Sequence, residues 1–244
     1  MNRWPLLPPE TTADARVLLL GRATRAFGDG FVSILLPLHL ARLGLSNVQI
    51  GAVATATLLG SAALTLGVGF VANRVGQRAL LLRASLLMAA TGIGFATLRD
   101  FWPLLVVAFV GTINPSSGDA SVFLPTEQAL LPRTTSDAQR TALFARFSLL
   151  GSLVAALGAL FAAAPGVAAE RTGIPLDRAV DAMFVLYAGL GLAVFALYRG
   201  LSPTLGARST EATRPLGESR RTVLGLAALF SLDSFGSGLV VQSL

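Results

Sequence analysis

Seven apolar runs, each about the length needed to cross a bilayer, are distributed along the whole chain. They constrain the possible folds of the chain more than any other feature. They cover roughly 17–41, 47–72, 79–98, 101–124, 139–164, 179–199 and 221–244. Hydrophobic residues make up 53% of the sequence and charged residues 13%, against roughly 25% charged residues in a soluble domain. We therefore expect an all-α integral membrane protein that lies in a lipid bilayer.

Helix-cap patterns precede two of these runs. Ser46 is followed by Gln49, and Ser136 by Gln139, which is the spacing of a capping box. In such a box each side chain satisfies a backbone N–H group at the start of the helix. We expect helices to begin at both positions.

The basic residues are all arginine, and most lie in the connections between the runs. With the N-terminus in the cytoplasm, eleven arginines fall on the internal side and four on the external side, as the positive-inside rule requires. The net charge of +6 therefore indicates topology, and no nucleic-acid partner is expected. We predict a multi-pass protein of the bacterial plasma (inner) membrane with a cytoplasmic N-terminus.

The residue types that are missing exclude several functions. Without lysine there is neither a Walker A motif for ATP nor a retinal Schiff base, and without cysteine there is no thiolate metal site. No grouping of nucleophile, base or metal ligands predicts an enzyme, a cofactor or a metal. His39, the single histidine, lies near the external end of the first run and is expected at the membrane interface.

A repeated pattern predicts the domain organisation. The stretch "AFGDGFVSILL" at 26–36 is echoed by "SFGSGLVVQSL" at 234–244, with one phenylalanine and two glycines at an offset of 208. We expect a cytoplasmic tail over 1–16, a six-helix domain over 17–200, a cytoplasmic linker over 201–220, and the first helix of an incomplete C-terminal domain over 221–244. A missing C-terminal half would complete the full-length protein; a genuine seven-helix protein is the alternative.

The connection between the second and third runs resembles a known family signature. "GFVANRVGQR" at 69–78 is similar to the motif of the major facilitator superfamily, in which a glycine is followed by a small residue, an aspartate, an arginine and a glycine before basic residues. Asn73 departs from it, because the family usually has aspartate there. The resemblance implies an MFS-type six-helix bundle plus one further helix, and secondary active transport of a small solute by alternating access. Transport direction and solute stay open.

The same resemblance implies a conformational role for the motif, which would hold the two halves of the transporter together in one state. The residues to which it assigns this role are Gly69, Asn73, Arg74, Gly76, Arg78 and Glu127. The arginines can meet carbonyl groups at helix C-termini or a nearby carboxylate, and Glu127 is the candidate carboxylate. The alternative is that these arginines only fix the topology.

The first run carries charges well inside the membrane. Asp29 lies about 18 Å along a helix that begins near Val17, beyond the middle of a roughly 30 Å hydrocarbon core. A charge there costs at least about 2.5 kcal/mol, so such a residue is by default a functional candidate. Arg22, Arg25, Asp29 and Ser33 are spaced by three, four and four residues and share one helical face.

The resemblance implies that the first, fourth and seventh helices line the central cavity. The candidate substrate and proton pathway is therefore formed by Arg25, Asp29, Ser33, Asn114, Asp119 and Asp233. The repeat places Arg25 opposite Asp233, and we expect the two to interact. Pairing of Arg25 with Asp29 at i, i+4 is the alternative. The carboxylates make protons a candidate coupling ion.

A second function fits the same composition. A membrane-spanning permease subunit of a larger complex, driven by a separate ATPase chain, would also consist of apolar helices without a nucleotide site of its own. Co-purification with an ATPase would favour this alternative over a secondary transporter.

Overall fold

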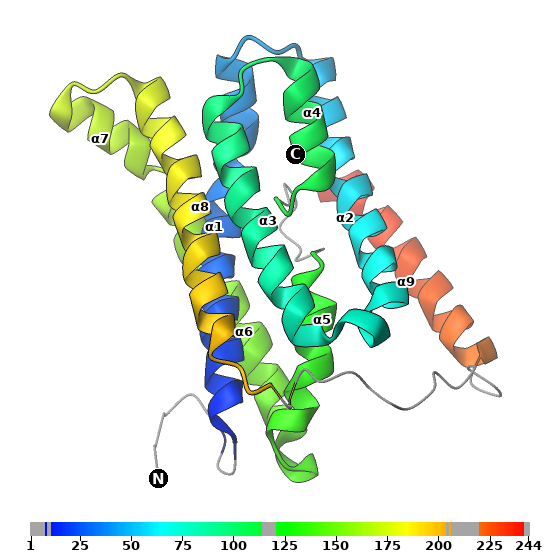
Figure 1. Cartoon of the computed structure of the whole chain (residues 1–244). Helices are drawn as coiled ribbons and strands as arrows, with labels where there is room; N and C mark the ends of the chain where they lie inside the picture. Colours follow the sequence, from blue (N-terminus) through cyan, green and yellow to red (C-terminus); the bar gives the residue numbers. More distant parts are fainter. Residues whose placement is uncertain (1–7, 9–10, 114–120, 204, 206–219, 242–244) are drawn as a thin grey trace. The chain divides into compact units, whose positions relative to one another are not determined.

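The computed structural model describes residues 8, 11–113, 121–203, 205 and 220–241, and within them the side chains of all but 70–74, 220 and 234–241. This part of the chain is helical and contains no strand (Figure 1). The helices are α1 (Ala13–Arg42), α2 (Asn47–Val75), α3 (Gln77–Thr97), α4 (Phe101–Val110), α5 (Phe123–Leu130), α6 (Arg140–Phe161), α7 (Ala164–Thr172), α8 (Leu176–Arg199) and α9 (Arg220–Val241), with 3-10 turns η1 (Leu131–Thr134) and η2 (Asp137–Gln139). The all-α prediction is confirmed.

The chain divides into two compact units, Met1–Arg208 and Ser209–Leu244. The first unit contains α1 to α8, and the second contains α9. The predicted division into a tail, a six-helix domain, a linker and the start of another domain stays a prediction.

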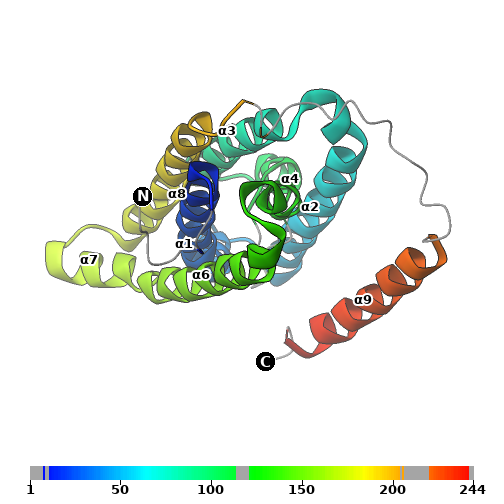
Figure 2. The same ribbon diagram turned by 90° about the horizontal axis from the view of Figure 1, so that it is seen from below.

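Glycines let the helices of the first unit approach closely. α1 packs against α6 and α8, α3 packs along α8, and α2 packs against α4 (Figure 2). A Cβ atom at Gly158 of α6 would collide with the carbonyl oxygen of Phe27 on α1, and one at Gly92 of α3 would lie 2.7 Å from the carbonyl oxygen of Phe184 on α8. Small residues at such contacts are typical of membrane helices, where close van der Waals packing replaces the hydrophobic effect.

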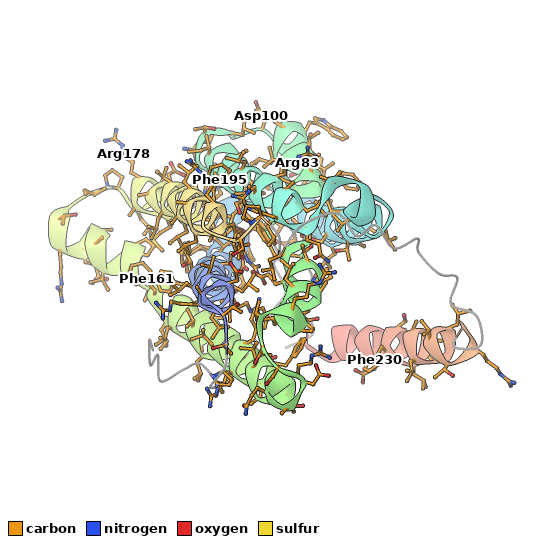
Figure 3. All side chains as sticks on the ribbon, turned by 60° about the horizontal axis from the view of Figure 1, so that its bottom comes forward. Arg83, Asp100, Phe161, Arg178, Phe195 and Phe230 are labelled. Carbon is orange, nitrogen blue, oxygen red and sulfur yellow. The ribbon has the colours of Figure 1, made fainter. Side chains whose placement is uncertain are left out.

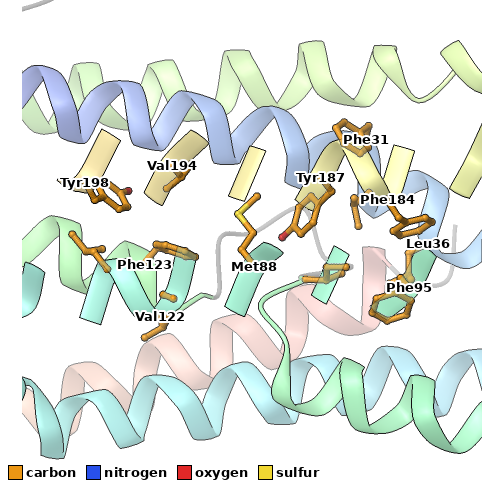
Figure 4. Packing of buried hydrophobic residues seen from close by; sticks show 14 of the residues in the cluster. Phe31, Leu36, Met88, Phe95, Val122, Phe123, Phe184, Tyr187, Val194 and Tyr198 are labelled. Carbon is orange, nitrogen blue, oxygen red and sulfur yellow. The ribbon is translucent and has the colours of Figure 1, made fainter. Parts of the chain in front are cut away.

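The apolar side chains occupy both the interior and the outer surface of the first unit. Phe31, Phe95, Phe123 and Phe184 are fully buried between the helices (Figure 4). Large apolar residues such as Leu160 are exposed, which suits contact with lipid tails. Charged side chains at the ends of helices, Asp100 and Arg178 among them, point away from the bundle (Figure 3).

Within the described residues, four segments are long and apolar enough to cross a membrane. These are Asn47–Gly69, Gln77–Thr97, Asp137–Thr172 and Leu176–Arg199. α1, which carries the charged face predicted from the sequence, lies outside this group. Together with the family assignment below, these helices support an integral membrane protein.

One local prediction was wrong, and one apolar run is interrupted. The run 101–124 is not one continuous helix, because α4 ends at Val110 and α5 begins at Phe123. Pro115 offers a reason: its ring would clash with the carbonyl group of Gly111 in a continuous helix. At the second predicted cap the Ser136 hydroxyl makes no capping bond, since the Gln139 N–H donates to the backbone carbonyl of Ser136 in a 3-10 turn. The first capping box is confirmed: Ser46 N–H donates to Gln49 Oε1 at 2.9 Å, and Gln49 N–H donates to Ser46 Oγ at 3.3 Å.

Candidate functional site

A buried ion pair joins α1 to α5. One terminal guanidinium nitrogen of Arg25 donates to Glu127 Oε2 at 2.7 Å, and the two side chains are 1% and 0% exposed. The guanidinium carbon lies 4.2 Å from the centre of the Phe123 ring, which adds a cation–π contact. The other terminal nitrogen donates to Ser121 Oγ at 3.4 Å. Arg25 is therefore held on several sides by residues around the start of α5.

Asp29 is the second carboxylate beside Arg25. Its Oδ2 atom lies 4.0 Å from the guanidinium, and its side chain is 24% exposed. The i, i+4 contact left open by the sequence is thus present, but Glu127 is the closer partner. We call Arg25, Asp29 and Glu127 the ion cluster: one cation lies between a fully buried carboxylate and a partly exposed one.

Two tyrosines of α8 complete the surroundings of this cluster. The Tyr198 hydroxyl donates to Glu127 Oε1, and the Tyr187 hydroxyl donates to Asp29 Oδ1 at 3.2 Å. Sequence reasoning missed both residues. A signal was available, because they are the only two tyrosines of the chain and lie 11 residues apart, which is three helical turns and hence one face.

Among the other predicted pathway residues, Ser33 is the one that the structure describes in the first unit. Ser33 donates its hydroxyl to the Gly30 carbonyl of its own helix at 2.8 Å. Asn114 and Asp119 lie outside the described residues. Asp233 lies on α9 in the second unit, so its predicted contact with Arg25 stays a prediction.

Of the motif arginines, the structure describes the side chain of Arg78, and its contact differs from the predicted carboxylate. Glu127 was the expected carboxylate for the motif arginines, but it pairs with Arg25 and Tyr198 in the interior. Arg78 donates to the backbone carbonyl of Arg199 at 2.8 Å, so it meets a helix C-terminus, which was the other option. Glu127 pairs with Arg25 because a buried cation needs a counter-charge more strongly than a residue near the surface does.

The remaining motif residues lie in the last two turns of α2 and at the connection to α3. Gly76 has φ +83°, a left-handed conformation that favours glycine, and it precedes α3. Gly69 is exposed, and a Cβ atom there would contact nothing within 4 Å. The side chains of Asn73 and Arg74 lie outside the described set.

A cavity of about 520 Å³ lies between α2 and α5, next to the ion cluster. Ser121, which accepts a hydrogen bond from Arg25, contributes to its wall. The remaining lining residues are apolar or uncharged polar ones: Leu58, Ser61, Ala62, Thr65, Leu66, Leu124, Pro125 and Gln128. Volumes of this size are typical of sites for small molecules.

At the other end of α1, a second polar cluster joins α1, α3 and α8. His39 Nε2 lies 2.9 Å from the Phe95 carbonyl oxygen, and its Nδ1 lies 3.7 Å from Asp181 Oδ1. Arg99 holds Asp181 in a bidentate pair at 3.0 and 2.5 Å, and this hydrogen bonding raises the pKa of Arg99. His39 is only 3% exposed and lies between the helices, while its predicted place at the membrane interface stays a prediction. It is buried because Phe184 packs against its ring.

Comparison with known proteins places this bundle in a family. The sequence model of the Major Facilitator Superfamily matches this chain over residues 18–243. The chain belongs to the Major Facilitator Superfamily. An MFS-type transporter of Salmonella arizonae, YcaD, is 28% identical over 139 residues, which cover 57% of this chain and 35% of that protein. The resemblance of the 69–78 motif is thereby confirmed at the level of the family.

Other relatives agree with this MFS assignment. A membrane protein of Saccharomyces cerevisiae is 27% identical over 177 residues, covering 72% of this chain and 40% of that protein. A crystal structure of a POT family transporter in complex with a thioalcohol-conjugated peptide has a TM-score of 0.58 at 17% identity, covering 94% of this chain and 46% of that one. That likeness concerns the fold alone. The MFS chain described here spans less than half the length of these relatives.

Proposed function

We propose that this MFS chain forms part of a secondary transporter that moves a small solute across a membrane by alternating access, with protons as the coupling ion. Family membership supports the general activity. The observation that carries the proposal for this chain is the ion cluster, because charges placed within a membrane helix are costly and are characteristic of ion and substrate pathways.

The geometry of the cluster supports a switch between two arrangements. Arg25 is shared between Glu127 at 2.7 Å and Asp29 at 4.0 Å. When Asp29 takes up a proton or binds a cation, it stops attracting Arg25, and of the two acids Glu127 alone then attracts the guanidinium. Since these residues lie on α1 and α5, the change alters the forces between two helices of the bundle. A ligand that favours one arrangement shifts the population toward it.

Several further assignments belong to the same proposal. The N-terminus is cytoplasmic and the membrane is the bacterial inner membrane, as the arginine distribution favours. A C-terminal half of the full-length protein begins with the helix at 221–244, and Asp233 on that helix faces the pathway. We expect residues 1–244 by themselves to transport little, because this pathway would lack its second wall.

The proposal is tested with the natural protein that contains this chain, reconstituted in liposomes with a pH-sensitive dye inside. A panel of small solutes is added against an imposed proton gradient, and proton movement is recorded. Asp29→Asn should abolish solute-dependent proton flux at unchanged protein levels. The matched control is Asp177→Asn, which weakens the ion pair between Asp177 and Arg42. Because the Asp177 side chain is 64% exposed, this variant should leave the flux intact.

Two results would contradict the proposal. Equal fluxes in the wild type and Asp29→Asn would remove Asp29 from the mechanism. Transport that requires ATP and a co-purifying ATPase chain would favour the permease alternative.

A further inference from the structure

The two tyrosines of α8 are each fitted to a glycine of α1. A Cβ atom at Gly21 would lie 2.6 to 2.8 Å from the Tyr198 ring carbons and hydroxyl, and one at Gly28 would lie 3.0 Å from the Tyr187 ring. Both tyrosines are almost fully buried, at 1% exposure or less (Figure 4). Gly21 and Gly28 are seven residues apart, about two helical turns, so they share a face of α1. That face accommodates both rings.

The two tyrosine hydroxyls donate hydrogen bonds to different acids of the ion cluster. Tyr198 donates to Glu127, whose other oxygen accepts from Arg25, so both oxygens of this buried carboxylate are occupied. Tyr187 donates to only one oxygen of Asp29, and the other faces Arg25 at the longer distance of 4.0 Å. Glu127 is therefore held by close contacts on both oxygens, whereas Asp29 is held loosely and is partly exposed.

We propose that Tyr187 and Tyr198 are positioning residues that give the two acids different tasks. Tyr198 fixes Glu127 as the permanent counter-ion of Arg25, and Tyr187 holds Asp29 in a state from which it can exchange a proton. The exchange itself rests on the proposed transport function. The hydrogen-bond assignment does not, because it concerns contacts within this chain.

The charged groups around Asp29 belong to two helices in the described residues. Arg22 and Arg25 lie on α1 with it, and Glu127 lies on α5. Its neighbour on α8 is the neutral Tyr187. A pH-dependent signal at Tyr187 can therefore be traced to a carboxylate by removing one acid at a time.

The test is ¹⁹F NMR of the chain with 3-fluorotyrosine incorporated. Since the sequence has two tyrosines, two resonances arise, and Tyr187→Phe and Tyr198→Phe assign them. Glu127→Gln should shift the Tyr198 resonance by more than its linewidth and leave that of Tyr187 nearly unchanged. Asp29→Asn should do the reverse, and Asp177→Asn should shift neither. Shifts of both resonances by each variant, or of neither, would overturn the assignment of separate pairs.

A titration separates positioning from a merely structural contact. Between roughly pH 4 and 9, where carboxyl groups with normal or raised pKa values titrate, the Tyr187 resonance should move between two plateaus while that of Tyr198 stays constant. Asp29→Asn should abolish the movement. A flat Tyr187 resonance in the wild type would refute the exchange role, even if the protein transports a solute by another route.

Glycine variants give an independent measurement if an acid variant fails to fold. Gly21→Ala presses on the Tyr198 ring and should shift that resonance alone, whereas Gly28→Ala should shift the Tyr187 resonance alone. Gly51→Ala meets nothing within 4 Å and serves as the control. If Gly21→Ala and Gly28→Ala both behave like Gly51→Ala, the rings are not seated on these glycines and the proposal fails.

Discussion

Removing the charge of Arg25 should destabilise the protein more than removing either of its acidic partners. At an effective dielectric constant of about 20, two unit charges attract by about 6 kcal/mol at the Arg25–Glu127 distance of 2.7 Å and by about 4 kcal/mol at the Arg25–Asp29 distance of 4.0 Å. Desolvation offsets much of this. The measured cost of breaking a buried pair by deleting one partner is about 3–5 kcal/mol.

The two single variants differ in what they leave behind. Glu127→Gln leaves Arg25 with Asp29 and the Phe123 ring, so we expect a loss near the lower limit, about 3 kcal/mol. Arg25→Met leaves Glu127 buried and two carboxylates facing each other, so we expect about 5 kcal/mol. The double variant Arg25→Met/Glu127→Gln removes the stranded charge and should be more stable than Arg25→Met, which corresponds to a coupling of more than about 3 kcal/mol between the two sites.

The free energy of unfolding can be measured by SDS titration in mixed micelles, followed by far-UV circular dichroism. Arg42→Met is the matched control, because it breaks an exposed ion pair with Asp177 and should cost less than about 1 kcal/mol. A double variant no more stable than Arg25→Met, which means a coupling of about 3 kcal/mol or less, would refute the reasoning.

Three further predictions concern the scaffold and can be measured by the same titration. Gly158→Val should cost about 1–3 kcal/mol, because its side chain would collide with the α1 backbone, whereas Gly51→Val, in open space, should change stability by less than about 0.5 kcal/mol. Arg78→Gln removes a cation from the C-terminus of α8 and should cost about 0.3–1 kcal/mol, less in high salt. Asp181→Asn should cost about 1 kcal/mol, since its partner Arg99 is 48% exposed, and the difference from wild type should shrink as salt is added.

Local sequence patterns predicted the features that depend on neighbouring residues. The Ser46 capping box formed as expected, because its two partners lie within one turn. The contact between Arg25 and Asp29, which their spacing offered as the alternative to a contact with Asp233, is also present. The Ser136 cap failed because a 3-10 turn used the same backbone N–H group, a competition that the spacing alone does not reveal.

The sequence by itself determined that this chain builds apolar helices, where its charges fall along them, and which family motif it carries, since all of these follow from composition and short spacings. The tertiary structure decided the partner of each buried charge. Glu127 lies 102 residues from Arg25, and Tyr198 lies 71 residues from Glu127, so no local period links them. They meet because glycines of α1 admit the α8 tyrosines and because a desolvated guanidinium is stable only beside a carboxylate that the packing brings within reach.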